Sequence, residues 1–86
     1  MNKIDELKSL IEERSPQALL ADGFDEAIIG LDTNSGRVIY DLKKMIEILM
    51  KDMTEQEAIE HFDFNIASAY MGKHTPIYME RLIDEE

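Results

Sequence analysis

The chain has 86 residues, and its nineteen acidic and nine basic residues give a formal net charge of −10. This length suffices for one domain without a second core, and the hydrophobic share of 44% is ordinary for a globular protein. Nucleic-acid binders gain most of their affinity by neutralising phosphates with Lys and Arg. The composition therefore argues against direct binding to nucleic acid or to anionic membrane surfaces, and it suits a basic protein partner.

Other classes of site and location are excluded by residue types that the chain lacks. It contains no cysteine, so disulfides and thiolate metal sites are impossible. Charged residues at positions 3, 5, 6 and 8 leave no hydrophobic region of a signal peptide, and no apolar run is long enough to span a bilayer. We therefore expect a cytoplasmic protein that does not associate with membranes.

The first part of the chain predicts two helices. Apolar residues recur at helical spacing over residues 4–11, which is typical of an amphipathic helix. Ser15 and Pro16 then have the chemistry of a helix N-cap and a first helical residue. We expect a short second helix from Pro16 to Asp22, ended by Gly23.

Residues 27–40 predict a β-hairpin. Side chains alternate in character over 27–31 and again over 37–40, as in strands, and Thr33-Asn34-Ser35-Gly36 supplies the turn between them. The turn superficially resembles a calcium-binding EF-hand loop. Arg37 occupies the place that such a loop reserves for Gly, so we interpret the segment as a hairpin turn.

Two further helices are predicted by their capping residues. Asp41 can cap a helix whose apolar stripe extends over residues 42–53. Thr54-Glu55-Gln56-Glu57 matches the capping box of a fourth helix. This helix should extend from Glu55 to about Met71 and end at Gly72.

The predicted fold class is α+β, in a single domain with the order α-α-β-β-α-α-β. A lone hairpin is marginal in water, so residues 77–79 should add a third strand to the antiparallel pair. The third and fourth helices should cover one face of this sheet. Residues 80–86 form a charged tail.

The fourth predicted helix is apolar on two sides. One side carries an apolar stripe at helical spacing, formed by Ala58, Ile59, Phe62, Ile66, Ala69 and Tyr70. Phe64, Ala67 and Met71 project from roughly the opposite side. A helix that is apolar all round must be buried by something. Either the first helix covers the second side, or Phe64 and Met71 form an interface with a partner or with a second copy in a homodimer.

Two polar features each have a structural and a functional interpretation. Asn65 lies in mid-helix, where we expect its amide to hydrogen-bond a nearby backbone edge, with recognition as the alternative. The loop Asp22–Glu26 is interpreted as a helix stop before a strand, in which Phe24 packs as an anchor. Its alternative is an acidic recognition loop that presents Asp22, Phe24, Asp25 and Glu26 to a partner.

The sequence carries no pattern that demands a metal or a catalytic mechanism. Glu57 and His61 lie four residues apart and His74 follows later, but a zinc site needs three or four converging ligands and there is no HExxH motif. The nucleophile motif GxSxG and the phosphate-binding motif GxxxxGK are also lacking. We expect no enzyme activity, no metal and no cofactor.

Several segments resemble a family of small uncharacterised proteins from tailed bacteriophages and prophages. The resemblance covers about residues 22–77 and is carried by Asp22–Gly30, Glu57–Asn65, Ala69–Gly72 and Thr75-Pro76. Ser68 departs from the pattern, which has Gly there. The resemblance implies a phage or prophage origin and carries no catalytic residue. Small phage accessory proteins commonly bind and redirect a host protein, including defence systems.

One leading hypothesis and two alternatives follow. In the leading hypothesis the chain is a non-enzymatic acidic accessory protein that binds and inhibits a host protein through the loop Asp22–Glu26 or the outer side of the fourth helix. In the first alternative it mimics DNA and blocks a nucleic-acid-binding protein. In the second it is a small metal-dependent hydrolase that uses His61, His74 and neighbouring carboxylates.

Overall fold

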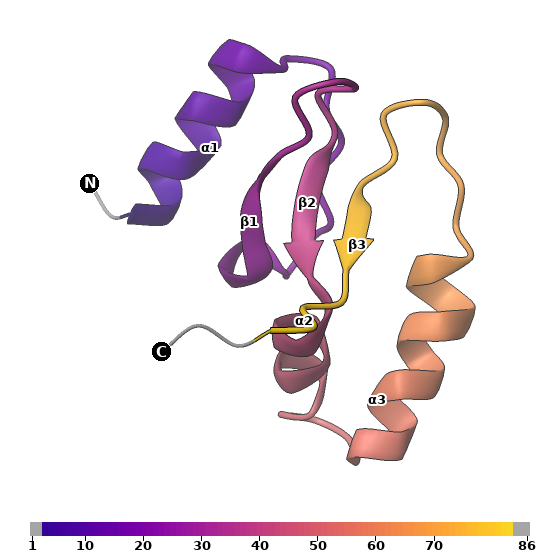
Figure 1. Cartoon of the computed structure of the whole chain (residues 1–86). Helices are drawn as coiled ribbons and strands as arrows, with labels where there is room; N and C mark the ends of the chain where they lie inside the picture. Colours follow the sequence, from indigo (N-terminus) through magenta and orange to yellow (C-terminus); the bar gives the residue numbers. More distant parts are fainter. Residues whose placement is uncertain (1–2, 84–86) are drawn as a thin grey trace.

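A three-stranded sheet forms the centre of the molecule. In the computed structural model, which describes residues 3–83, β1 (Ile28–Leu31) and β2 (Val38–Asp41) pair antiparallel, and β3 (Ile77–Met79) pairs with β2 in parallel (Figure 1). The strand order is β1-β2-β3, so β2 is central and has a strand on each side. The predicted hairpin, the third strand and the α+β class are confirmed.

The turn of the hairpin is closed by one carboxylate. The Asp32 carboxylate accepts hydrogen bonds from the Ser35 hydroxyl at 2.6 Å and from the Ser35 amide at 3.0 Å. These bonds stabilise the charged form and lower the pKa of Asp32, with the hydroxyl as the largest cause. Gly36 follows with a φ of +74°, which a residue without a Cβ adopts at no steric cost.

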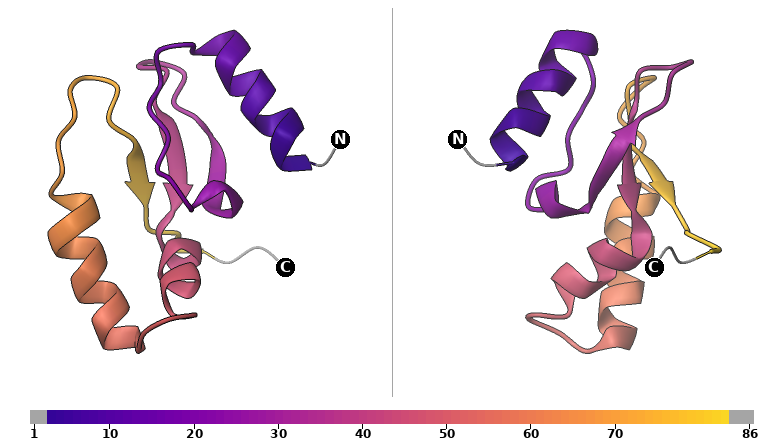
Figure 2. Two further views of the ribbon diagram at one scale, coloured as in Figure 1. Left: turned by 180° about the vertical axis from the view of Figure 1, so that it is seen from behind. Right: turned by 60° about the vertical axis from the view of Figure 1, so that its left-hand side comes forward.

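The first predicted helix is confirmed as α1 (Lys3–Arg14). Its Ile11 side chain is buried in the core, and Leu7 packs against the same cluster. The helix lies beside β1, on the side of the sheet that faces away from β3 (Figures 1 and 2).

The predicted helix over residues 16–22 is wrong. Beyond the turn at Pro16, the backbone forms hydrogen bonds with distant parts of the chain. The Ala21 amide donates to the Tyr40 hydroxyl at 2.7 Å, and the Leu19 amide donates to the His74 carbonyl at 3.4 Å. The short 3₁₀ turn η1 (Asp25–Ala27) forms instead, directly before β1. The order of elements is therefore α-β-β-α-α-β.

Asp41 ends β2 and caps α2 (Leu42–Leu49), as its position in the sequence predicts. Its carboxylate accepts a hydrogen bond from the Lys43 amide at 3.1 Å. The Met45 side chain is fully buried beneath the sheet residues of the core. The helix ends at Leu49, so it is shorter than the predicted 42–53.

The fourth predicted helix begins as expected and ends early. It consists of α3 (Glu55–His61), which starts with the predicted capping box, and the π-helical turns η2 (Phe62–Ala67). The end at Ala67 corrects the predicted end at Met71. The Ser68 hydroxyl donates back to the Phe64 carbonyl at 2.8 Å, a bond that competes with continued helix. Gly72, with a φ of +97°, lies in the following loop.

The core is concentrated on β2 and the elements that touch it. Val38 and Tyr40 are fully buried, and the Tyr40 ring lies near that of Tyr78, with centroids 6.1 Å apart. Burial is the largest cause that raises the pKa of the Tyr40 hydroxyl, because the charged phenolate loses its hydration there. The same cause raises the pKa of Tyr78.

The helices lie at different places around the sheet. α2 continues directly from the end of β2, whereas α1 and α3 lie at opposite edges of the sheet, beside β1 and β3 (Figures 1 and 2). Within residues 3–83 no helix has the length and apolar character needed to cross a bilayer. The last three residues of the predicted charged tail, 84–86, lie outside the described part of the chain.

Candidate functional site

The capping box fixes the start of α3 and hence the directions of its side chains. The Thr54 hydroxyl accepts from the Glu57 amide at 3.2 Å, and the Glu57 carboxylate accepts from the Thr54 amide at 2.9 Å. These bonds satisfy N–H groups that a helix start leaves without intrahelical partners. The first turn of α3 is thereby held in one conformation.

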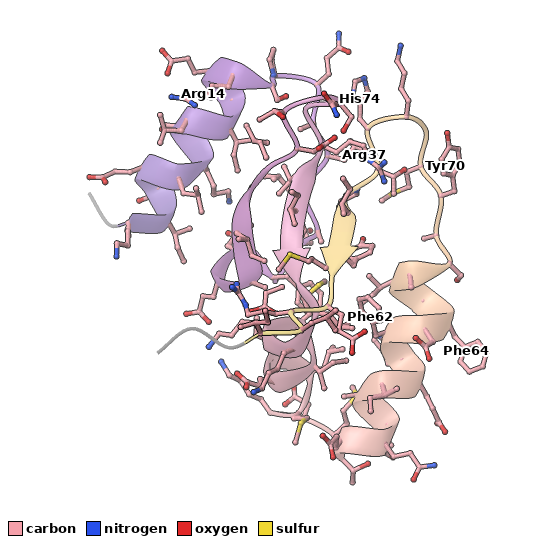
Figure 3. The ribbon with its side chains drawn as sticks, in the orientation of Figure 1. Arg14, Arg37, Phe62, Phe64, Tyr70 and His74 are labelled. Atoms are coloured by element: carbon pink, nitrogen blue, oxygen red, sulfur yellow. The ribbon has the colours of Figure 1, made fainter. Side chains whose placement is uncertain are left out.

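Two phenylalanines of η2 point to opposite sides. Phe62 is buried, and its ring meets the Tyr78 ring edge-on with centroids 5.2 Å apart. Phe64 is 77% exposed and projects away from the sheet (Figure 3). The expectation that the first helix covers this side is wrong, because α1 lies across the sheet beside β1. Packing of Phe62 thus leaves the Phe64 ring in water.

The chain around α3 is uniformly acidic. Between Asp52 and Ser68 the sequence has five carboxylates and no Lys or Arg; they belong to Asp52, Glu55, Glu57, Glu60 and Asp63. The ion pairs within residues 3–83 lie elsewhere, at Lys8–Asp25, Lys44–Glu47 and Arg81–Asp41. The carboxylates of α3 therefore form no ion pair with a cation of the described residues.

A shallow depression of about 420 Å³ brings these features together. It is lined by Asp52, Met53, Glu57, Glu60, His61, Phe64 and Asn65, which we call the α3 outer face. Carboxylates, an amide and an imidazole here share one surface with an exposed aromatic ring. Such a surface can accept hydrogen bonds from cationic side chains, and an aromatic face attracts the same cations.

Asn65 differs from its predicted role. It is exposed, and its side-chain nitrogen lies 3.3 Å from Nδ1 of His61. No described backbone edge lies against it to accept the amide hydrogen bond that the sequence predicts. Asn65 instead joins His61 on the α3 outer face.

The loop that follows η2 presents two further apolar side chains. Tyr70 is 79% exposed and Met71 is 54% exposed, and Figure 3 shows Tyr70 on the same outer side of the molecule as Phe64. The sequence pattern places Tyr70 on the inward stripe, which is wrong because the helix ends at Ala67. The early end could have been anticipated from Ser68, whose hydroxyl competes for a backbone carbonyl.

Thr75 fixes the backbone of this loop. Its hydroxyl accepts from the Met71 amide at 2.8 Å and donates to the Gly72 carbonyl at 2.6 Å. The Thr75 side chain is buried although it is polar, and the Arg37 guanidinium donates to the Thr75 carbonyl from the hairpin. The loop is therefore tied to the sheet, which holds Met71 in a defined place.

Two residues of the loop Asp22–Glu26, Phe24 and Asp25, contact the rest of the protein. Phe24 packs against the core cluster, as its structural interpretation predicts, and the Asp25 carboxylate pairs with Nζ of Lys8 at 3.1 Å. Asp22 and Glu26 are exposed. The loop precedes β1, on the far side of the sheet from α3 (Figure 1). The structure therefore does not bring its residues together with Phe64 and Met71.

The two histidines are held in separate surroundings. His61 contacts Asn65, and the His74 carbonyl accepts from the Leu19 amide on the opposite stretch of the chain. Within residues 3–83, no three side chains of the metal-ligating types His, Asp and Glu converge on one point. The described residues therefore offer no ligand set for the metal-dependent hydrolase alternative.

A comparison with protein-family models, with curated proteins and with solved structures finds no match to this chain.

Proposed function

We propose that this chain is a non-enzymatic accessory protein of phage type that binds a basic host protein through the α3 outer face and inhibits it. The observation that carries the proposal is Phe64, an aromatic side chain left 77% exposed on the same acidic surface as Asp52, Glu57 and Glu60. Aromatic anchors dominate the binding energy of many interfaces. The resemblance to phage proteins supports the origin, and the charge supports the chemistry of the partner.

Charge complementarity favours a basic partner over a second copy of this chain. A homodimer would bring together two molecules that each carry a formal charge of −10. Like charges placed opposite one another suppress association, whereas a Lys- or Arg-rich surface would meet carboxylates that form no ion pair within the described residues. The outer face therefore fits a cationic protein surface with a pocket for the Phe64 ring.

The test compares the unchanged protein with Phe64→Ser and with a control of similar chemistry, Leu10→Ser on α1. Each is immobilised, and proteins retained from a bacterial lysate are identified by mass spectrometry. The best retained protein is then purified, and its dissociation constant is measured for all three. The proposal predicts that Phe64→Ser weakens this binding by about tenfold or more while Leu10→Ser changes it little.

Equal binding by all three proteins would show that the outer face is not the interface. If light scattering shows that the original protein is a dimer and Phe64→Ser is a monomer, the face is assigned to a second copy instead. Both results would overturn the proposal, and neither depends on the partner's identity.

A DNA mimic is the second candidate, and the run of five carboxylates without a basic residue from Asp52 to Ser68 favours it. A mimic competes with nucleic acid for its partner, and its binding weakens steeply as salt screens the charges. Binding through Phe64 depends on apolar contact and varies less with salt. Measuring the dissociation constant between about 50 and 500 mM salt, with and without Phe64→Ser, therefore separates the two mechanisms.

A further inference from the structure

A second concave surface lies between α2 and α3, on a different side of α3 from Phe64. It is a groove of about 580 Å³ whose apolar lining comes from Leu42, Ile46, Met50, Ile59 and Phe62. Phe62 is buried and forms part of its floor, whereas Met50 and Ile59 are exposed at its walls. Apolar side chains from both helices thus face an unfilled space.

The rim of this groove is predominantly acidic. Glu47, Glu55, Asp63 and Glu80 line it together with two cations, Lys43 and Arg81. Arg81 lies 3.9 Å from the Asp41 carboxylate, which offsets its charge. The Glu55 and Asp63 carboxylates form no ion pair with another described residue. The groove therefore combines an apolar floor with a negative rim.

From this geometry we propose that the groove is a docking site for an amphipathic helix of the partner, one that carries Lys or Arg on either side of its apolar face. An apolar groove between helices accepts such a helix through side chains at i, i+3, i+4 and i+7. The cations beside that face would meet Glu55, Asp63 and Glu80. The inference deepens the proposed function, because it names the kind of element that the basic partner presents.

The dimensions of the groove fit a short helical segment. α2 has eight residues, so it is about 12 Å long. Two turns of a bound helix have about the same length and present about three or four apolar side chains on one face. Met50 adds adaptability at one wall, because an unbranched thioether side chain can repack around differently shaped partners.

The experiment uses a synthetic peptide of leucine and lysine, labelled with a fluorophore, whose leucines fall at i, i+3, i+4 and i+7. A second peptide has the same composition in an order that forms no apolar helical face. A third replaces every lysine with glutamate. Binding to the full chain is measured by fluorescence anisotropy, and helix formation of the bound peptide by circular dichroism.

Ile59→Ser removes an apolar wall of the groove, and Leu10→Ser is its matched control, because Ile59 is 45% exposed and Leu10 is 47% exposed. The proposal predicts that the first peptide binds and gains helix. Ile59→Ser should weaken its binding by about tenfold, whereas Leu10→Ser should leave the dissociation constant within about twofold.

Several outcomes would overturn the inference. These are equal binding of the two lysine peptides, tighter binding of the glutamate peptide, equal effects of Ile59→Ser and Leu10→Ser, or loss of peptide binding on Phe64→Ser, which would place the peptide on the α3 outer face. Conversion of a dimer to a monomer by Ile59→Ser would assign the groove to a second copy.

The failure of this inference is distinguishable from failure of the proposed function. If Phe64→Ser reduces retention of the partner while Ile59→Ser leaves peptide binding unchanged, the α3 outer face is supported as the interface and only the docking role of the groove is rejected. If the peptide results agree with the proposal while Phe64→Ser leaves partner binding unchanged, the groove is supported as a docking site and the α3 outer face is rejected as the interface.

Discussion

β2 and the segment 64–71 are both rich in apolar and aromatic residues, yet most of their large side chains have opposite surroundings. On β2, Val38 and Tyr40 are fully buried, whereas Phe64, Tyr70 and Met71 lie largely in water. Burial of apolar area is the main favourable term in folding, so the first set contributes to stability and the second contributes little. Exposed apolar side chains that gather on one side of a protein indicate an interaction surface.

The difference follows from topology. β2 has a strand on each side, and its Val38 and Tyr40 side chains lie on a fully buried face, whereas Ile39 and Asp41 on the other face are half-buried. α3 and η2 lie beside β3, and η2 reaches the sheet through Phe62, whose ring contacts that of Tyr78. Among residues 3–83 no further helix or strand covers the other side of α3 and η2.

The largest expected effect is on the β2 side of this comparison. Met45→Ala opens a cavity beside β2 and should lower the free energy of unfolding by about 2–5 kcal/mol. Met50→Ala makes the same chemical change at an exposed position and should change that free energy by less than about 0.5 kcal/mol. Urea unfolding followed by circular dichroism measures both, and similar losses in the two variants would contradict the assigned core.

The next largest effect is expected at Thr75, in the loop that follows η2. Thr75→Val removes the hydroxyl that bonds the Met71 amide and the Gly72 carbonyl, and it should cost about 1–3 kcal/mol because both groups lose a partner. Thr75→Ser keeps the hydroxyl and should cost less. Thermal unfolding of the two variants tests whether Thr75→Val is the less stable one. The opposite result would show that the Thr75 methyl group contributes more to stability than its hydroxyl.

Tyr40 links the stability of β2 to pH. Its pKa is raised in the folded protein, so the folded state retains the phenolic proton more tightly than the unfolded state. Stability from the neutral phenol is complete below about pH 10 and is lost as pH rises through the folded pKa. Tyr40→Phe should cost about 0.5–1.5 kcal/mol at neutral pH through the lost bond to the Ala21 amide.

The melting temperature of Tyr40→Phe should also fall less steeply than that of the unchanged protein between about pH 9 and pH 11. A remaining decline is expected because the pKa of Tyr78 is raised as well. Parallel declines in the two proteins would show that the Tyr40 hydroxyl does not contribute to the alkaline loss of stability.

The smallest expected effect lies at the turn before β2. Ser35→Ala removes the hydroxyl that most lowers the pKa of Asp32, so this pKa should rise toward its ordinary value of 3.8. An NMR titration of the carboxyl carbon measures the change. An unchanged pKa of Asp32 would show that the hydrogen bond from the backbone amide of residue 35 is enough to keep this pKa low.

The parts of the fold that the sequence predicts are those fixed by local chemistry. Asp41 and Thr54 cap their helices through bonds within three residues, so their positions were readable along the chain. The conformation of the segment 16–22 could not be predicted from the sequence, because its amides donate hydrogen bonds to Tyr40 and His74, which are far away in sequence. Helix propensity cannot compete with such tertiary bonds.

The candidate site shows the same division. The two-sided apolar pattern of residues 58–71 predicts that Phe64 and Met71 face either α1 or a partner. The placement of α1 beside β1 excludes the first alternative and could not be predicted from the pattern. The groove between α2 and α3 could not be predicted, since it depends on the spacing of two helices. The turn residues around Phe24 predict that its side chain packs as an anchor, and Phe24 does contact the core cluster.

The central claim is that Phe64 is exposed for binding and contributes little to folding. The most direct measurement is the free energy of unfolding of Phe64→Ser, obtained by urea denaturation at two protein concentrations. We expect a value within about 0.5 kcal/mol of the unchanged protein at both concentrations. A loss of about 3 kcal/mol or more, as expected for a phenylalanine removed from a core, would contradict the claim.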